Sequence, residues 1–158
     1  MGIDLQVFDI GAIEEGDFSV KFHLITKGDN FKWALVCVYG PAQEDRKVRF
    51  LTELANLGAR ERLPILIGGD FNILRNPKEK NKPNFNPRWP FLFNAVIEGR
   101  NLRELEITGR QFTWANALAN PTFEKLDRIL MSTDWELHFP RATTVAGNRD
   151  LSDHTPLL

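Results

Sequence analysis

Pro64-Ile-Leu-Ile-Gly-Gly-Asp-Phe-Asn72 is the stretch on which the predicted fold depends. Its first half is apolar and β-prone, which predicts a short strand buried on both faces. Two glycines follow, and glycine permits unusual backbone angles and the close approach of a ligand. Residues two apart in a strand point to the same side, so we expect Asp70 and Asn72 to project together at the strand end, where open sheets place their sites. The alternative is an ordinary turn, because Asp and Asn are common turn residues.

The segments before this stretch predict a hairpin and a long helix. Residues 17–26 alternate between apolar and polar, which is the pattern of a half-buried strand. A turn signal at residues 28–30 leads into the nearly all-apolar run 33–39, which predicts a central strand. Residues 43–60 carry apolar side chains at helical spacing with charges between them, which predicts an amphipathic helix.

The segments after this stretch continue the alternation of strands and helices. Residues 76–88 are rich in Asn, Pro and Lys and predict a loop, whereas residues 89–99 have helical periodicity. Strands are predicted at 111–115, 125–131 and 141–146, with a helix capped by Ser132 or Thr133 between the last two. The pattern predicts a single domain over residues 1–158 of the α+β class, with helices packed outside a mixed sheet system.

The composition is that of a globular protein in a reducing compartment. Hydrophobic residues make up 42% and charged residues 26% of the 158 residues, and no apolar run is long enough to span a membrane. One cysteine, Cys37, excludes an internal disulfide. We expect an intracellular protein, nuclear or cytoplasmic, with no membrane partner. The net charge of -1 is unlike that of a dedicated nucleic-acid binder, so any grip on phosphate must be local or metal-assisted.

Two further acidic positions are candidates for chemistry. In Ser152-Asp153-His154, an Asp beside a His can orient the imidazole, bind a divalent ion or cap a helix. Asp127 lies inside a strand-like run, where an acidic residue is costly unless it is paired. An ion pair with Arg128 or a solvent-facing position is the alternative explanation for Asp127.

An aromatic and basic set surrounds these positions. Tyr39 closes the apolar run 33–39 and is expected to be a core aromatic with its hydroxyl at the rim. Basic residues of the loop are interleaved with Phe85 and Trp89, a composition that suits a nucleic-acid backbone and stacked bases. A flexible solvated loop is the alternative. These basic residues are Lys78, Lys80, Lys82 and Arg88.

The order of these motifs resembles the endonuclease/exonuclease/phosphatase superfamily. The order is Val38-Tyr39-Gly-Pro, Ile67-Gly-Gly-Asp70-Phe-Asn72, Phe112-Thr113-Trp114, Leu126-Asp127-Arg-Ile-Leu and then Ser152-Asp153-His154. The segments between them look most like the endonuclease domain of plant LINE-type (non-LTR) retrotransposons. Residues 87–94 and 121–128 are part of that likeness.

The resemblance implies a fold and a reaction. The fold is a DNase-like, four-layer αββα arrangement: a two-sheet β-sandwich flanked by helices. The reaction is Mg²⁺-dependent (or Mn²⁺-dependent) hydrolysis of a phosphodiester, most specifically the nicking of DNA. A metal and hydrogen-bond donors would stabilise the charge that builds on the phosphate while a base prepares the water.

The resemblance also implies a role for each matched residue. Asp70 would activate or orient the attacking water, and Asn72 and Tyr39 would hold the phosphate. His154 would stabilise the charge on the phosphate, with Asp127 fixing its tautomer, and Asp153 would help to bind the metal. The remaining candidates are implied to bind DNA: Thr113, which would line the cleft, Trp114, Ser152, Lys78 and Arg88.

The chain departs from the family at its beginning. The family has an early strand with an Asn and a strand that ends in Gln-Glu-Thr or similar, whose glutamate is a metal ligand, and neither motif is present here. Glu14 and Glu15 lie in a Gly-flanked segment that predicts a loop. We therefore expect a domain that lacks the family's first strands, with weakened metal binding and with sheet edges that a second copy or a protein partner would cover. Two alternative functions follow: a catalytically impaired module that binds nucleic acid or protein, and a phosphatase that acts on a small phosphoester.

Overall fold

A mixed six-stranded sheet forms the centre of the protein in a computed structural model that describes residues 2–149 and 152–158. In spatial order the strands are β1 (Phe8–Glu15), β2 (Ser19–Thr26), β3 (Lys32–Tyr39), β4 (Ile65–Asp70), β9 (Asp127–Met131) and β5 (Arg103–Leu105). β3 and β4 run parallel, and the other neighbours run antiparallel.

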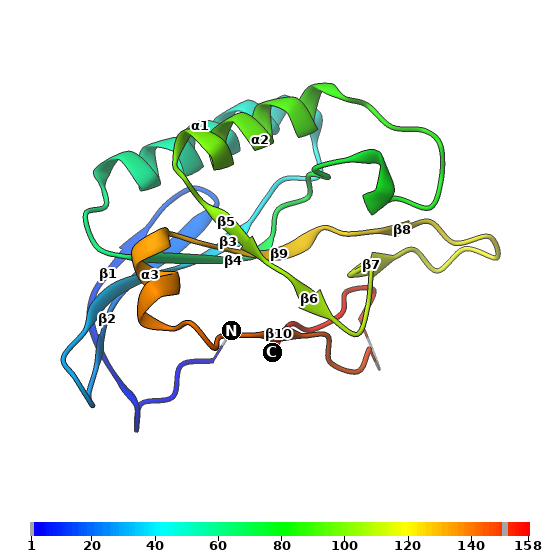
Figure 1. The fold of residues 1–158 in the computed structure, drawn as a ribbon. Coiled ribbons are helices and arrows are strands. Elements are labelled where there is room, and N and C mark those ends of the chain that lie inside the picture. Colours follow the sequence, from blue (N-terminus) through cyan, green and yellow to red (C-terminus); the bar gives the residue numbers. More distant parts are fainter. Residues whose placement is uncertain (1, 150–151) are drawn as a thin grey trace.

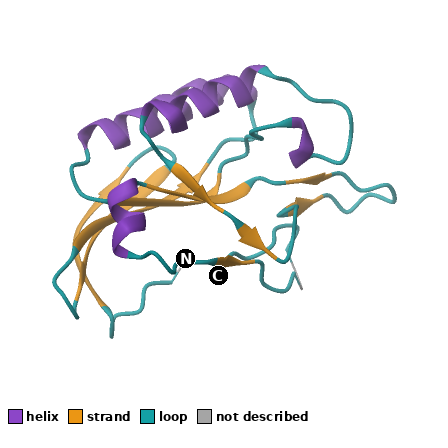
Figure 2. Ribbon diagram, viewed as in Figure 1, coloured by secondary structure: helices purple, strands orange, loops and turns teal. Residues whose placement is uncertain are grey.

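Helices and two small strand pairs complete the described chain. The helices are α1 (Glu44–Arg60), α2 (Arg88–Gly99), α3 (Thr133–His138) and the short 3₁₀ helix η1 (Pro77–Glu79). The pairs are β6 (Ile107–Thr108) with β10 (Thr144–Val145) and β7 (Trp114–Ala115) with β8 (Phe123–Glu124). Figure 1 shows α1 and α2 side by side over one face of the sheet, with α3 and the β6–β10 pair on the other side. Figure 2 shows that the β6–β10 pair is short beside the strands of the central sheet.

The sheet separates two apolar cores because β3 alternates. Ala34, Val36 and Val38 face α1 and α2, in a cluster with Phe50 and Phe93 of those helices. Trp33 and Leu35 point to the opposite face, where Trp135 of α3 covers them. Burying one large apolar side chain contributes about 1.5–3 kcal/mol. This double burial explains why the β3 sequence is apolar at consecutive positions.

Most predicted elements are confirmed. The α+β class with outer helices is present, β2 and β3 form the predicted hairpin, and the Ser132 side chain accepts a hydrogen bond from Trp135 N at the start of α3. The predicted strand over residues 111–115 is reduced to β7. Among the described residues, no helix is both long and apolar enough to cross a membrane.

One prediction is wrong: Glu14 and Glu15 lie at the end of a strand, not in a loop. β1 is one of the two edge strands of the sheet, and its residues are exposed except for Phe8, which is half-buried. An edge strand without a buried face lacks the alternation by which strands are recognised. Its pairing with β2, which includes a bulge between Ile10 and Ile13, is what makes it a strand.

Candidate functional site

The ends of three adjacent strands place the first site residues. β4 lies between β3 and β9, and the register sets Asp70 opposite Tyr39 on one side and opposite Asp127 on the other. Gly69 makes this possible, because its φ of 143° is unfavourable for other residues and a Cβ there would collide with the Val38 carbonyl oxygen. The double glycine therefore has a structural cause as well as a place beside the site.

Asp70 and Asn72 form one hydrogen-bonded unit after β4. Asn72 has a left-handed backbone, with φ of 49°, and its N–H donates to Asp70 Oδ1 at 2.9 Å. Asn72 Nδ2 donates to Asp70 Oδ2 at 2.6 Å and to the Gly40 carbonyl oxygen at 3.0 Å. An amide nitrogen has two N–H donors, and these two hydrogen bonds use both of them. This corrects the sequence-based role for Asn72, which orients Asp70 in this structure and has no amide donor left for a phosphate.

His154 is brought to Asp70 from the far end of the chain. Its Nδ1 lies 2.9 Å from Asp127 Oδ2, and its Nε2 lies 3.8 Å from Asp70 Oδ2. A β-bridge between Trp114 and His154 anchors this segment, and Ser152 Oγ accepts a hydrogen bond from His154 N. A carboxylate on one ring nitrogen leaves the other nitrogen to face the neighbouring group. Asp127 therefore pairs with His154, the partner that the resemblance implies, and not with Arg128, the partner in the alternative explanation.

Thr113 requires a correction. It is fully buried, and its Oγ1 accepts hydrogen bonds from Leu126 N at 3.0 Å and Asp127 N at 2.9 Å. The hydroxyl is therefore not available to DNA. It holds the backbone at the start of β9 and so fixes the position of the Asp127 carboxylate.

The acidic groups differ in their electrostatics. Burial raises the pKa of Asp70 above its ordinary value; the Asn72 N–H opposes that rise, and the Asp127 carboxylate adds to it. Asp153 lies at the surface, where a hydrogen bond from Trp114 Nε1 to its Oδ2, 2.9 Å long, lowers its pKa. The two shifts have opposite directions: burial favours the protonated form of Asp70, and the Trp114 hydrogen bond favours the ionised form of Asp153.

The described side chains at the site suit a divalent cation. One ligand atom each from Asp70, Asp127 and His154 lies within 4.8 Å of the others. Opposite ligands of one Mg²⁺, Mn²⁺ or Ca²⁺ ion lie about 4–5 Å apart, and two carboxylates with an imidazole are acceptable donors. Asp153, the residue that the resemblance assigns to the metal, is outside this group and stands at the rim.

These groups line one cavity of about 500 Å³. Tyr39, Asp70, Asn72, Asp153 and His154 line it together with Trp114, while Asp127 stands behind His154. Further lining residues come from the loop before α2 and from the start of α1, in particular Lys47, Lys80, Asn84, Phe85, Asn86 and Trp89. Tyr39 is 73% exposed, so its ring is a rim residue and not the core aromatic that the sequence predicted.

The predicted DNA-binding cations occupy the surroundings of the cavity. Lys78 and Arg88 are exposed and do not line it, and the Arg88 guanidinium lies 4.7 Å from the centre of the Trp89 ring. Lys80 is held in a 2.7 Å ion pair with Glu124, and Lys82 Nζ donates to the Asn120 carbonyl oxygen at 2.9 Å. Two of the loop lysines are therefore engaged within the protein.

Lys47 is the site residue that sequence reasoning missed. It lies in the first turn of α1, eight residues after Tyr39, among charges that look like the solvated face of a helix. Burial lowers its pKa. Its closeness to the Tyr39-Gly-Pro motif was the available signal, but helical periodicity says nothing about which loop a helix start faces.

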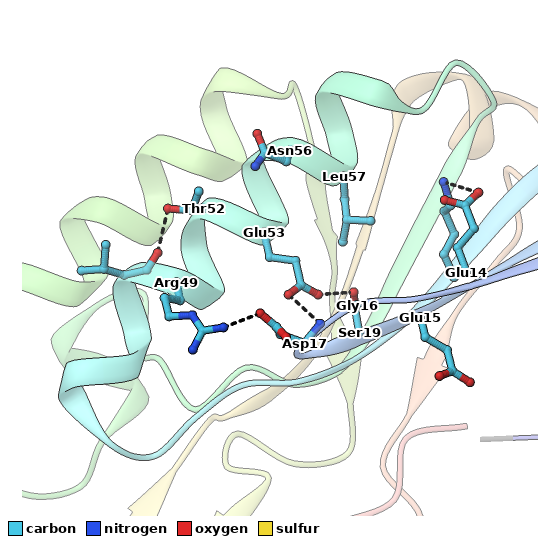
Figure 3. Close-up of a pocket in the computed structure, with 12 residues that line it drawn as sticks. Glu14, Glu15, Gly16, Asp17, Ser19, Arg49, Thr52, Glu53, Asn56 and Leu57 are labelled. Carbon is cyan, nitrogen blue, oxygen red and sulfur yellow. Dashed lines mark hydrogen bonds and ion pairs between the residues drawn. The ribbon is translucent and has the colours of Figure 1, made fainter.

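Glu14 and Glu15 belong to a different place. They line a second cavity, of about 510 Å³, between the β1–β2 turn and α1 (Figure 3). There the Glu53 carboxylate, from α1, accepts hydrogen bonds from Asp17 N at 3.0 Å and from Ser19 Oγ at 2.5 Å. These hydrogen bonds fix the β1–β2 turn against α1. Neither Glu14 nor Glu15 lines the cavity that contains Asp70.

Comparison with known proteins gives a family. The sequence model of the endonuclease/exonuclease/phosphatase family matches residues 3–154. No curated protein matches the sequence.

Solved structures share the fold at low identity. The endonuclease domain of TRAS1, a telomere-specific non-LTR retrotransposon, has a TM-score of 0.75 and 14% identity, over 98% of this chain and 68% of that chain. A beta toxin from Staphylococcus aureus has a TM-score of 0.60 and 18% identity, over 89% of this chain and 55% of that chain. TDP2 from D. rerio, solved with a single-strand DNA product, has a TM-score of 0.57 and 10% identity, over 96% of this chain and 67% of that chain.

Proposed function

Because this chain belongs to the endonuclease/exonuclease/phosphatase family, we propose that it is a metal-dependent phosphodiesterase, most specifically a DNA endonuclease that nicks one strand. The observation that carries the proposal is the contact of the His154–Asp127 pair with the buried Asp70 carboxylate at one end of the sheet. We further propose that the chain derives from a retroelement of the plant LINE type. The order of its motifs and its likeness to the TRAS1 domain support that origin.

The protein residues divide the work of hydrolysis. Asp70 orients the attacking water and accepts its proton; its raised pKa favours that exchange. His154 directs Nε2 at the phosphate and stabilises its growing negative charge, while Asp127 on Nδ1 keeps the ring in one tautomer. Asn72 holds Asp70 in place, and the exposed Tyr39 hydroxyl donates to the phosphate from the rim.

The metal role falls to carboxylates on the Asp70 side of the cavity. Asp153, which lines the same cavity as Asp70, would be the carboxylate ligand of a divalent ion, because Mg²⁺ uses one or two carboxylates and takes water and substrate phosphate for the rest of its shell. This assignment leaves the 2.9 Å contact between His154 and Asp127 intact. When bound, the ion supplies positive charge that offsets the charge on the phosphate.

The proposed substrate is DNA because of what surrounds the reacting groups. Phe85 and Trp114 line the cavity together with Lys47, while Trp89, which also lines it, is only 5% exposed. Aromatic surfaces stack on bases and lysines bind phosphates, which favours a nucleic-acid substrate. Exposed Lys78 and Arg88 are proposed to extend the contact outside the cavity, with Ser152 and Trp114 fixing the segment that carries His154.

The test is conversion of supercoiled plasmid to the nicked form with Mg²⁺ or Mn²⁺ and with EDTA. We expect metal-dependent nicking that Asp70→Ala and His154→Ala abolish. The matched control is His23→Ala, because His23 has a similar exposure of 31% and also lies 3.0 Å from a carboxylate, that of Glu61, but outside the cavity.

Three outcomes separate this proposal from its alternatives. Nicking that survives both site substitutions overturns the assignment of the site. Tight DNA binding without any metal-dependent cleavage supports the catalytically impaired binding module instead. Rapid release of phosphate from a small phosphoester, with DNA left intact, supports the phosphatase.

A further inference from the structure

Hydrogen bonds join the segment before α1, at Gly40, to the segment after β4 that contains Asp70 and Asn72. Gly40 N donates to the Asp70 carbonyl oxygen at 2.7 Å, and Asn72 Nδ2 donates back to the Gly40 carbonyl oxygen. A Cβ at Gly40 would collide with the Phe71 carbonyl oxygen, so the two segments are in close backbone contact. This contact brings Lys47, in the first turn of α1, to the mouth of the cavity.

The Lys47 ammonium is held there at two points. Its Nζ donates to the Asn72 carbonyl oxygen at 3.0 Å, and it lies 5.9 Å from the centre of the Trp89 ring. An ammonium group has three N–H donors, and the Asn72 carbonyl takes one of them. Two donors therefore remain for a ligand in the cavity.

Lys47 differs from the other lysine of the cavity in its ion pairing. The cavity is lined by two lysines, Lys47 and Lys80, and Lys80 is neutralised by Glu124. Among the described residues, Lys47 has no carboxylate within ion-pair distance, although its side chain is half-buried. The Glu44, Glu124 and Asp70 carboxylates act on Lys47 only at longer range, so a partly desolvated cation of this kind gains free energy when an anion binds directly beside it.

We propose that Lys47 binds a phosphate of the nucleic-acid strand that flanks the scissile phosphate. This inference rests on the proposed function, since it concerns the same cavity. The flanking position follows from the contacts: the Lys47 ammonium donates to the Asn72 carbonyl oxygen, whereas the Asn72 amide donates to Asp70. Because Lys47 makes no ion pair with Asp70, the phosphate that it binds is placed beside the scissile phosphate and not on it.

The test measures binding and not only cleavage. A short fluorescent DNA duplex is titrated in EDTA at several salt concentrations, with Lys47→Met, Lys47→Arg and wild type. Loss of one phosphate contact reduces the slope of log K against log salt by about 0.9, so the wild-type advantage shrinks roughly threefold between about 50 and 200 mM salt. Lys47→Arg should keep the wild-type slope. Lys32→Met is the matched control, because exposed Lys32 begins β3 at the end opposite the site.

A second measurement separates a flanking from a scissile contact. Bis(4-nitrophenyl) phosphate has a single phosphate, so Lys47→Met should lose a larger factor in DNA cleavage than in hydrolysis of this compound. Equal slopes for Lys47→Met and wild type, no DNA binding by the wild type, or an equal loss of rate on both substrates would each overturn the inference. Absence of metal-dependent cleavage, with the slope change still present, would instead count against the proposed reaction and leave the Lys47 contact supported.

Discussion

Replacing Arg128 by Met is expected to destabilise the protein more than any surface charge change. Arg128 follows Asp127 in β9, and its side chain is fully buried. Its guanidinium donates to both carboxylate oxygens of Glu79, at 3.1 and 2.9 Å, and to those of Glu104 at 3.1 Å. It also donates to the Ile73 and Lys125 carbonyl oxygens. Methionine fills a similar space but cannot donate a hydrogen bond to any of these acceptors.

The size of the effect follows from the buried carboxylates. Burial by itself would raise the pKa of Glu104, but Arg128, with Lys125 and Arg75, holds it at about 2 instead of 4.5. At 1.36 kcal/mol per unit, that depression corresponds to roughly 3 kcal/mol of stability near neutral pH. Removal of one partner from a buried ion pair costs about 3–5 kcal/mol. We therefore expect Arg128→Met to lower the free energy of unfolding by about 3–5 kcal/mol.

Urea unfolding followed by tryptophan fluorescence measures this loss. Arg103→Met is the matched control, since Arg103 pairs with Glu136 at 2.8 Å on the neighbouring strand β5 but is 66% exposed. An exposed pair contributes about 0–1 kcal/mol. A loss for Arg128→Met no larger than that of Arg103→Met would refute the reasoning.

The pH dependence gives a second, independent check. A carboxyl group whose folded pKa is depressed stabilises the protein above its unfolded pKa, and this contribution disappears as the pH falls toward the folded pKa. For Glu104 the window runs from about 4.5 down to about 2. The difference in stability between wild type and Arg128→Met should therefore narrow over that range. A constant difference would contradict the assigned role of the ion pairs.

Three further predictions concern the site. Asp127→Asn should reduce the nicking rate about 100-fold or more while the fold is retained, because an amide beside Nδ1 no longer fixes the tautomer of His154; a rate within a factor of three of wild type would contradict it. Burial raises the pKa of Asp70 above its ordinary value of 3.8, and the ionised form is the active one. The value of kcat/KM should therefore rise with pH in the acidic range, and a flat profile there would count against Asp70. Gly69→Ala should lower the free energy of unfolding by about 3 kcal/mol, because its Cβ meets the Val38 carbonyl oxygen, whereas Gly28→Ala, which faces open space, should change it by less than about 1 kcal/mol in urea unfolding.

Local patterns were enough to predict the elements that have a buried face. β3 and β4 are apolar at consecutive positions because both of their faces are covered, and α1 has one apolar stripe because one face packs on the sheet. β1 was missed because an exposed edge strand carries no such pattern. The difference is physical, since periodicity records burial, whereas edge pairing depends on backbone hydrogen bonds that any sequence can make.

Some residues of the site were likewise predictable from the sequence, and others were not. The order of motifs was sufficient to select Asp70, Asp127 and His154, and the structure brings all three together. The motifs did not reveal that Thr113 is buried beneath Asp127 or that Lys47 faces the cavity. Both facts depend on which backbone groups lie next to these side chains after folding.

The sequence by itself therefore determined the α+β class, the central hairpin and helix, and the set of acidic and imidazole groups at the strand ends. Only the tertiary structure decided further partners: Arg128 with Glu79 and Glu104, and the Asn72 amide with Asp70. Burial appears in the sequence as a local pattern of apolar residues, because each side chain either faces the core or does not. Hydrogen-bond partners lie far apart in sequence, and the packing of β4 between β3 and β9 is what selects them.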